Sequence, residues 1–397
     1  MDLLIEIHRQ RLKWTDTTFV RSLVNRIDWN SRLIGIKGSR GVGKTTLMLQ
    51  YIKQNYGNST DVLYVSLDNI WFTNHKMSDL VDDFVKRGGK YLFLDEVHKY
   101  PSWAQEIKNV YDNYPQLSIV FTGSSLLEIL NARADLSRRA DIYHLPGLSF
   151  REYMEMFHGI RLPTYSFPDI LERHSDISDE VLSLFRPLQY FDDYLREGYY
   201  PFYVENPKRF PIRLEETVNM ILEIELPLLR HVDYAYVHRI KQLLQIISQS
   251  TPFIPNVSKL AERIGISRAT LTTYLKYLEE TELLISLYKD SRGISALQKP
   301  EKIYLGNTNL MYVLNTENVN KGNLRETFFA NQVQYGHVLQ YSDASDFLVD
   351  GKFTFEIGGK QKSRKQIEGL EYAFVVSDDI EYGSGKRIPL WMFGLLY

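Results

Sequence analysis

The sequence contains no cysteine among its 397 residues. This absence excludes disulfide bonds, cysteine-ligated metal sites and cysteine nucleophiles, and it fits a protein of the reducing cytoplasm. No apolar run approaches the roughly 18 residues that a membrane-spanning helix needs. The segment Met1–Ile7 is acidic, and its apolar run is too short for a signal peptide. We therefore expect a cytoplasmic protein without a membrane partner.

The sequence also lacks an excess of charge of either sign. Its 47 Lys and Arg residues and 49 Asp and Glu residues give a formal net charge of −2. A nearly neutral chain is not attracted to nucleic acid as a whole, so any such binding requires a local basic patch. The hydrophobic content of 44% and charged content of 24% are typical of a globular protein, and this length predicts two or three domains.

What the sequence does have is a complete phosphate-binding loop, G-x-x-x-x-G-K-[ST], at Gly38–Thr45. A buried-strand pattern at Leu33–Ile36 precedes the loop, and a helical pattern at Thr46–Ile52 follows it. The backbone N–H groups of such a loop surround nucleotide phosphates, and its glycines allow the backbone to come close to the ligand. The residues that we expect to bind the nucleotide are Gly38, Ser39, Arg40, Gly41, Val42, Gly43, Lys44, Thr45 and Thr46.

Two side chains of the loop predict ATP and Mg²⁺ as cofactors. Lys44 is expected to reach the β and γ phosphates, and Thr45 to place its hydroxyl on Mg²⁺. The helix that begins there adds the positive end of its dipole to the binding of the phosphates.

A second element is an apolar strand that ends in two acids. Leu92–Leu94 leads into Asp95 and Glu96, which is the Walker B pattern, and another strand pattern at Val62–Leu67 lies between it and the loop. Asp95 is expected to hold the Mg²⁺ shell, and Glu96 to orient or deprotonate the attacking water.

A third strand, Ser118–Phe121, runs into Thr122 and Ser124. In an additional-strand P-loop ATPase this strand lies between the two Walker strands. Two interpretations of its polar end remain open, and both can hold. Thr122 or Ser124 contacts the γ-phosphate or the water as a sensor, or these side chains cap the helix expected at Leu126–Leu130.

The fold class expected from these patterns is α/β. It comprises a P-loop NTPase parallel sheet with flanking helices, a winged helix and a small C-terminal α/β domain. We place an ATPase core with a helical lead-in at 1–147, a helical extension at 148–235, a winged helix-turn-helix at 236–298 and a nuclease-like α/β domain at 299–397. The end of the last domain, Leu390–Phe393, reads as a buried strand.

The winged helix is predicted from three helices and a strand. The helices are expected at Tyr236–Ser248, Asn256–Ile264 and Arg268–Leu278, and the strand begins at Leu283. The side chains of the third helix that would face a DNA groove are Arg268, Thr270, Thr273 and Lys276, which indicates DNA as a possible partner.

That helix ends, however, in Glu279 and Glu280, which are expected to repel phosphates. A role in packing or oligomerisation therefore stays open beside DNA binding. A basic cluster of Lys360, Lys362, Arg364 and Lys365 reads either as a solvated loop or as a contact for a phosphate backbone.

With these motifs in view, nearly the whole chain resembles bacterial and archaeal AAA-type ATPases of the additional-strand P-loop class that carry a winged helix and a C-terminal restriction-nuclease-like domain. Beside the nucleotide motifs, the stretches that carry the resemblance are Phe121–Ser124, Leu136–Tyr153, Tyr194–Gly198 and Lys302–Leu314. The resemblance implies ATP hydrolysis in the cytoplasm, with cellular roles largely unassigned.

The resemblance also implies an arginine finger after a short Ser-Leu-Ala-Gly stretch. The matching segment here is Leu136–Arg139, so Arg139 is the candidate. Arg138 stands in place of the glycine, which leaves the choice between the two arginines open. A finger that acts in a neighbouring subunit would require a homo-oligomer.

The resemblance implies that the C-terminal domain of active relatives holds a metal with an Asp and a following Glu-x-Lys. Asp346 and Glu356 fall on this pattern, and Glu326 can supply a helix carboxylate. Gly358 stands where the lysine is needed, and Lys360 comes after a glycine pair that is expected to end the strand. Nuclease activity is therefore expected to be lost.

Three functions remain open. The first is an ATPase switch associated with nucleic acid, which is the preferred interpretation. The second is an ATP-dependent protein scaffold or signalling switch without nucleic-acid binding, and the third is an ATP-regulated nuclease.

Overall fold

The computed structural model describes the whole chain except residues 124–135, 137, 231, 251, 290–298 and 316–318. The chain divides into two compact units, Met1–Gly147 and Leu148–Tyr397. Each unit has its own sheets and its own buried side chains.

The first unit is built on a five-stranded sheet in which every neighbouring pair of strands is parallel. The strands are β1 Leu33–Lys37, β2 Val62–Ser66, β3 Tyr91–Asp95, β4 Ser118–Gly123 and β5 Asp141–His144. Their order across the sheet is β2-β3-β4-β1-β5. The predicted α/β class with a parallel sheet is thus confirmed, and β4 lies between the two Walker strands as expected.

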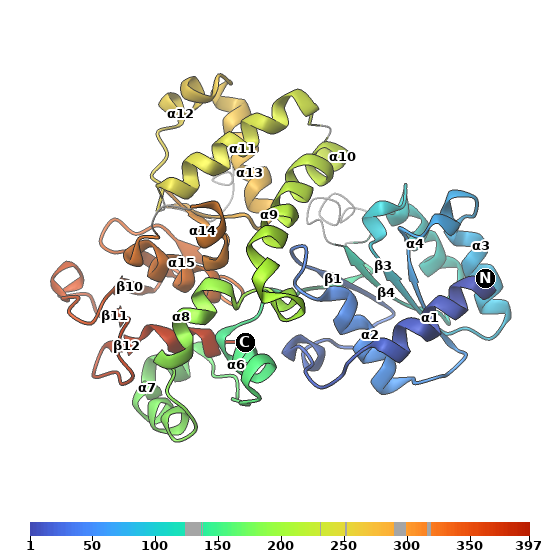
Figure 1. Ribbon diagram of the computed structural model, residues 1–397, viewed down its shortest axis with the longest axis horizontal. Coiled ribbons are helices and arrows are strands. Elements are labelled where there is room, and N and C mark those ends of the chain that lie inside the picture. The colour runs from blue at the N-terminus through green and yellow to red at the C-terminus, as the bar shows by residue number, and fades with distance from the viewer. Residues whose placement is uncertain (124–135, 137, 231, 251, 290–298, 316–318) are drawn as a thin grey trace. The chain divides into compact units, whose positions relative to one another are not determined.

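Helices cover this sheet (Figure 1). They are α1 Asp2–Trp14, α2 Lys44–Asn55, α3 Met77–Lys86 and α4 Trp103–Asn113. Four of the five residues of β1 are fully buried, which is the pattern of a parallel strand with both faces covered. Phe84 of α3 and Trp103 of α4 belong to the same buried cluster as Leu94 and Phe121 of the sheet. This packing fixes the strand ends that carry the polar residues.

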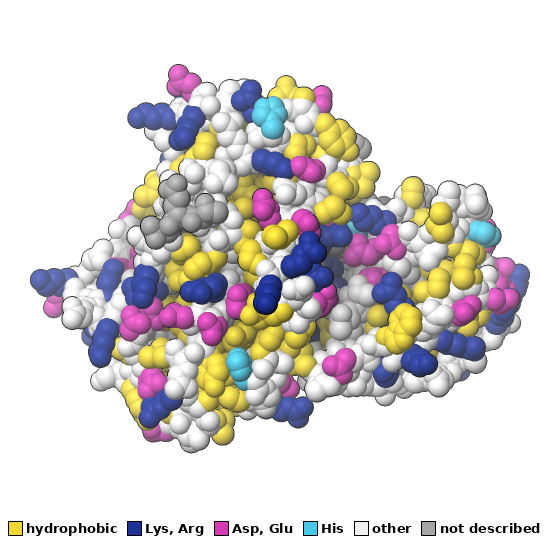
Figure 2. All heavy atoms as spheres, in the orientation of Figure 1, with side chains coloured by type: hydrophobic (Ala, Val, Ile, Leu, Met, Phe, Trp, Pro, Cys, Tyr) yellow, Lys and Arg dark blue, Asp and Glu magenta, His cyan; other side chains and the backbone are white. Residues whose placement is uncertain are grey.

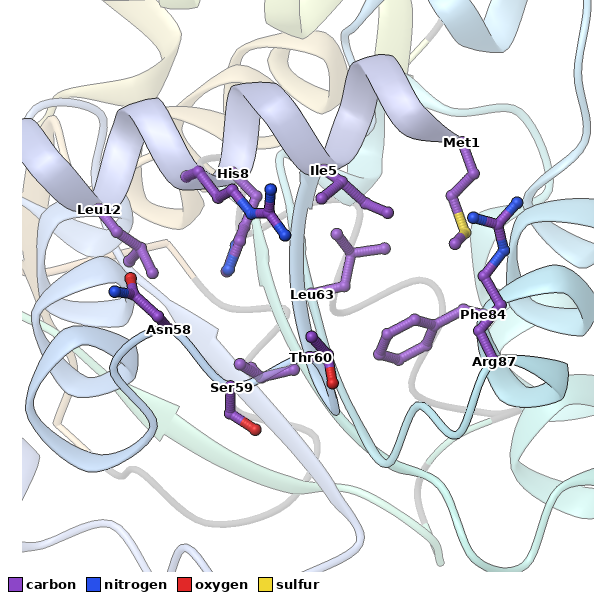
Figure 3. A pocket seen from close by; sticks show the side chains of 12 residues that line it. Met1, Ile5, His8, Leu12, Asn58, Ser59, Thr60, Leu63, Phe84 and Arg87 are labelled. Atoms are coloured by element: carbon purple, nitrogen blue, oxygen red, sulfur yellow. The ribbon is translucent and has the colours of Figure 1, made fainter.

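Helix α1 covers the outer edge of the sheet at β2. The buried His8 accepts a hydrogen bond at Nδ1 from the backbone N–H of Tyr64, at 3.0 Å, so one donor of the edge strand is satisfied by a side chain. Burial, and then the charge of Arg9, lower the pKa of His8 to about 4, so the ring is neutral at pH 7 and can accept. A cavity of about 220 Å³ remains beneath α1, with Ile5 and Phe84 in its lining (Figure 3).

The second unit begins with a helical region. Its helices are α6 Phe150–His158, α7 Phe167–Leu182, α8 Leu188–Glu197, α9 Phe210–Met220 and α10 Leu226–Arg230, with a π-helical turn at Ile221–Glu225 between the last two. Aromatic rings link these helices. Phe150 of α6, for example, packs edge-to-face against Phe191 and Tyr194 of α8.

Three further helices and a small sheet follow. They are α11 Tyr234–Gln249, α12 Val257–Ile264, α13 Arg268–Glu280 and the antiparallel pair β6 Leu284–Leu287 with β7 Lys302–Leu305. Asn256 and Ser267 cap α12 and α13 with their side chains, and Gly265 between the helices has a left-handed φ of 74°. The helix positions match those expected from the sequence, whereas their assignment as a winged helix stays a prediction.

The remainder forms a mixed five-stranded sheet with the order β12-β11-β10-β9-β8. Its strands are β8 Leu339–Gln340, β9 Phe347–Val349, β10 Phe353–Gly358, β11 Ala373–Ser377 and β12 Arg387–Pro389. Helix α15 Lys321–Val333 contacts β10, and α14 Thr308–Leu314 contacts α15. The predicted strand at Leu390–Phe393 is wrong, because a buried 3₁₀ helix spans Leu390–Leu395. Since every residue there is buried, the sequence shows no periodicity that separates strand from helix.

Among the described residues, no helix is both long enough and apolar enough to cross a membrane. On the face that Figure 2 shows, basic and acidic side chains both occur over the region of α11–α13.

Candidate functional site

The loop between β1 and α2 has the backbone that a phosphate-binding loop requires. Gly41 and Gly43 have φ values of 86° and 97°, which side chains with a Cβ rarely adopt. A Cβ on Gly38 would lie 2.2 Å from the carbonyl oxygen of Leu145, so only glycine fits there. The three glycines of the motif therefore each have a structural reason.

The loop is also held from outside by Arg21, which the sequence did not single out. This buried guanidinium donates to the carbonyl of Val42 at 2.6 Å and to those of Pro146 and Gly147 at 2.7 and 2.9 Å. It thus joins the loop to the segment after β5. No sequence pattern predicts this role, because Arg21 lies more than a hundred residues before Pro146 and Gly147 in the sequence.

Lys44 lies at the first position of α2, and its side chain is almost fully buried. Its ammonium donates to the carbonyl oxygens of Gly38 and Ser39, both at 2.7 Å. These bonds hold the cation against the loop, which is where a phosphate must bind if the loop serves a nucleotide.

The other residues that are predicted to bind the nucleotide differ in how far they are buried. Val42 and Ser39 are buried, Arg40 is half-buried, and Thr46 is exposed on the first turn of α2. Because Val42 is buried, it can offer a nucleotide only its backbone.

Asp95 is the centre of the polar network at the ends of the strands. It is buried, and its Oδ2 accepts from Thr45 Oγ1 at 2.7 Å and from Tyr64 hydroxyl at 2.9 Å. Its Oδ1 accepts from Thr122 Oγ1. The structure thus brings together the two predicted metal residues, Thr45 and Asp95.

The donor set at this place fits magnesium bound together with a nucleotide. Mg²⁺ is usually held by one or two protein oxygens, water and substrate phosphates rather than by a cage of carboxylates. Thr45 and Asp95 can supply these oxygens. Within the described part of the chain, no three His, Cys, Asp or Glu side chains gather into a metal site of their own.

Glu96 directly follows β3 and has a left-handed backbone, with φ of 54°. Its N–H donates to Thr122 Oγ1 at 3.3 Å, and its Oε2 lies 3.4 Å from Nε2 of His98. Thr122 therefore contacts both acids that end the Walker B pattern, and its role as a sensor stays a prediction. Ser124, the other sensor candidate, lies outside the described residues.

The two candidate finger residues differ in their surroundings. Arg139 donates from Nε and Nη2 to the two carboxylate oxygens of Asp112, at 3.0 and 3.2 Å. The hydrogen bonds from Arg139, and to a smaller extent its charge, lower the pKa of that carboxyl. Arg138 is exposed. A finger at position 139 must leave Asp112 to reach a nucleotide.

We expect Arg139→Ala to reduce the turnover of ATP about a thousandfold and ATP affinity by less than threefold, because a finger meets charge that develops only in the transition state. The measurement is steady-state hydrolysis together with nucleotide titration, with Arg138→Ala as the matched neighbour. If the finger acts in a neighbouring subunit, specific activity rises with protein concentration. Loss of turnover in Arg138→Ala alone would move the assignment to Arg138.

In the second unit the predicted acidic residues of the C-terminal domain do come together, but with lysines. Lys302 Nζ lies 2.8 Å from Glu326 Oε2 and 3.5 Å from Asp346 Oδ1. The hydroxyl of Tyr304 donates to Glu326 Oε2 at 2.8 Å. Asp346 Oδ2 accepts from the N–H of Ile357 at 2.8 Å.

Glu356 is buried and pairs with a lysine that the sequence reasoning did not choose. Lys362 Nζ lies 2.5 Å from Glu356 Oε1, whereas Lys360 is exposed. The other oxygen of Glu356, Oε2, is buried and has no hydrogen-bond partner among the residues that the structure describes. Burial raises the pKa of Glu356, and the hydrogen bond from Lys362 opposes this shift.

Gly358 explains how Lys362, rather than the exposed Lys360, reaches Glu356. Strand β10 ends at Gly358 as expected, and a Cβ at this position would lie 2.6–2.7 Å from the side-chain carbons of Lys362. Glycine leaves room for Lys362 to fold back over the strand end and reach Glu356. The spacing of residues along the sequence cannot predict that the chain folds back in this way.

This cluster does not fit a divalent metal in the arrangement described. Lys302 bridges Glu326 and Asp346, and Lys362 takes one oxygen of Glu356, so each carboxylate already has an internal cation. A metal would have to displace an ammonium group and repel the other.

On α13, Arg268, Thr273 and Lys276 are exposed and Thr270 is half-buried. Glu279 and Glu280, which are expected to repel phosphates, both have partners within the second unit. Glu280 Oε2 accepts from Arg230 at 2.7 Å, and Glu279 Oε2 accepts from the Tyr288 hydroxyl at 2.9 Å. Burial raises the pKa of Glu279. The ion pair with Arg230 offsets the charge of Glu280, and the repulsion of phosphates stays a prediction.

Two family models match parts of the chain. Residues 30–154 match an AAA domain, and residues 188–321 match a domain of unknown function. None of the curated proteins matches this sequence.

Solved structures match this chain only at low similarity. PCH-2 of C. elegans is 18% identical over 39% of this chain and 43% of its own, with a TM-score of 0.25. The Hsp104–ADP complex of S. cerevisiae is 15% identical over 70% of this chain and 41% of its own, with a TM-score of 0.31. AMPPCP-bound DnaA of Aquifex aeolicus is 13% identical over 65% and 84%, with a TM-score of 0.26.

The matches span less than half of the PCH-2 and Hsp104 chains, and TM-scores of this size carry no argument about function. The family match rests instead on the first unit, which contains the phosphate loop and both Walker B acids. Residues 30–154 of this chain match the AAA domain, and they include the five-stranded parallel sheet.

Proposed function

We propose that this protein binds ATP with Mg²⁺, hydrolyses it, and uses the nucleotide cycle as a switch associated with nucleic acid. The observation that carries the ATPase proposal is the meeting of Thr45 and Thr122 on the two oxygens of Asp95, directly beside the phosphate loop. A hydroxyl from the loop, a buried carboxylate and a polar strand end are the parts that phosphoryl transfer requires around its metal.

Each residue has a separate task in this proposal. Lys44 leaves the carbonyls of Gly38 and Ser39 and binds the β and γ phosphates, while Thr45 and Asp95 hold the Mg²⁺ shell. Glu96 accepts the proton of the attacking water, because its carboxylate lies one residue beyond the metal-holding Asp95 at the same strand end. When Mg²⁺ is bound it neutralises charge that develops on the phosphate oxygens.

The test of the whole proposal is ATP hydrolysis by the full chain with and without Mg²⁺. We expect turnover that disappears with EDTA. Electrophoretic binding to DNA and RNA, with and without ATP, then separates the switch on nucleic acid from a scaffold that binds only protein. We expect a cytoplasmic protein, and a homo-oligomer if the finger acts between subunits.

The nucleic-acid part of the proposal rests on α13. Its exposed Arg268 and Lys276 form the basic face of what we interpret as a winged helix, and Glu280 at its end is neutralised by Arg230. Binding should be modest, since few basic side chains are offered and the chain carries no net positive charge.

We expect Arg268→Ala combined with Lys276→Ala to weaken DNA binding and to reduce the slope of log K against log salt by about 1.8, which corresponds to about two phosphate contacts. The measurement is a salt series of fluorescence anisotropy with a labelled duplex. Lys208→Ala with Arg209→Ala, two exposed residues far from α13 in sequence, is the matched control. If the wild type does not bind at low salt, the scaffold function is favoured.

We also infer that the C-terminal domain does not cleave DNA. Lys302 and Lys362 occupy the carboxylates that a nuclease metal would need. Incubation of plasmid with the full chain and Mg²⁺ or Mn²⁺ should therefore leave the plasmid intact. Cleavage that disappears in Glu356→Ala but persists in Glu368→Ala would contradict this inference, and Lys362 would then be the lysine of the nuclease site.

A further inference from the structure

The strongest unassigned feature of the first unit is a histidine beside the proposed general base. His98 lies in the 3₁₀ turn Val97–Lys99 that directly follows Glu96. Its side chain is fully buried, and its Nε2 lies 3.4 Å from Oε2 of Glu96, which is 22% exposed. A buried imidazole thus contacts the partly exposed carboxylate that must reach water.

The charge state of His98 decides what this contact is. Burial, followed by the charges of Lys99, Lys44 and Arg40, lowers the pKa of His98 to about 3. The ring is therefore neutral at pH 7, so the 3.4 Å contact between Nε2 and Oε2 is not an ion pair. A neutral donor can orient the carboxylate of Glu96. A positively charged ring would instead stabilise the ionised carboxylate and make Glu96 a weaker base.

The backbone of Glu96 is fixed independently of its side chain. Its N–H donates to Thr122 Oγ1, and Thr122 donates in turn to Asp95, so the Cα of Glu96 is held relative to the metal-holding carboxylate. The flexible side chain has several rotamers from this fixed origin. In one of these rotamers the carboxylate of Glu96 reaches His98. The 3.4 Å between Nε2 and Oε2 is longer than the usual 2.7–3.2 Å of a hydrogen bond, so the contact restricts the Glu96 side chain without fixing it.

We propose that His98 is a positioning residue for ATP hydrolysis: as a neutral Nε2–H donor it selects the rotamer in which Glu96 faces the attacking water. This inference rests on the proposed ATPase function and on Glu96 as its general base. His98 itself touches neither nucleotide nor water in this scheme.

The test is a set of substitutions at position 98 in the full chain. We expect His98→Ala to lower kcat about tenfold, the lower end of what loss of an orienting partner costs. KM for ATP and the affinity for ATP under non-hydrolysing conditions should change by less than twofold. His98→Gln or His98→Asn, each of which keeps an N–H donor, should restore at least part of kcat.

A purely structural role would give a different result. Val81→Ala removes buried carbon from the same core and serves as the control for lost stability. It should lower the melting temperature without a change in kcat. If His98→Ala keeps the wild-type kcat, or if the Ala, Gln and Asn variants are all equally slow, the positioning role is wrong.

A second measurement does not depend on hydrolysis. In protein labelled with ¹⁵N-histidine, the His98 ring should be neutral at pH 7 and carry its proton on Nε2, and Glu96→Gln should shift that signal. A ring protonated on Nδ1 or on both nitrogens would overturn the inference. Failure of the proposed function is distinguishable, because wild-type protein would then show no ATP turnover, or Glu96→Gln would hydrolyse ATP normally.

Discussion

Lys44→Ala should weaken ATP binding at least about 100-fold, which corresponds to about 2.8 kcal/mol at 25 °C. Lys44 Nζ is held at the loop by the carbonyls of Gly38 and Ser39, so it stands ready to exchange these neutral acceptors for charged phosphate oxygens. Hydrogen bonds between charged groups are about twice as strong as neutral ones. The alanine variant keeps the loop N–H groups but loses this cation.

Isothermal titration calorimetry with ATP and Mg²⁺ measures this effect. Lys53→Ala is the matched control, because Lys53 lies on the same helix but donates to the carbonyl of Thr15 instead of the loop. It should bind ATP as the wild type does. If Lys44→Ala bound ATP with unchanged affinity, the assignment of Gly38–Thr45 as the phosphate site would be wrong.

Glu96→Gln should slow hydrolysis by about 100-fold to 10,000-fold, which is the range for loss of a general base. ATP affinity should stay within about threefold, because Lys44, Thr45 and Asp95 all remain. The amide also keeps an oxygen that can face Nε2 of His98. The variant should therefore be a stable protein that traps ATP.

Single-turnover hydrolysis and nucleotide titration separate the two effects. Glu106→Gln serves as the control, since Glu106 accepts a hydrogen bond from Tyr100 away from the Walker B strand end. Hydrolysis at the wild-type rate in Glu96→Gln would show that another group takes the proton.

The sequence alone predicted the candidate nucleotide site, and it determined the fold class, which the parallel sheet confirms. The phosphate loop, the Walker B acids and the strands before them are local patterns, because glycine spacing and apolar runs are consequences of backbone geometry within a few residues. The place of β4 between the Walker strands was also expected, whereas the places of β2 and β5 came only from the structure.

Only the tertiary structure decided which side chains meet. Tyr64 and Thr122 reach Asp95 from neighbouring strands, and Arg21 reaches Val42 from the lead-in segment. Lys362, and not Lys360, folds back over Gly358 to Glu356. Such contacts depend on the register of neighbouring strands and on where the chain folds back on itself, and neighbouring residues in the sequence do not encode either. A sequence pattern can therefore predict which side chains are functional, but not which side chains they contact.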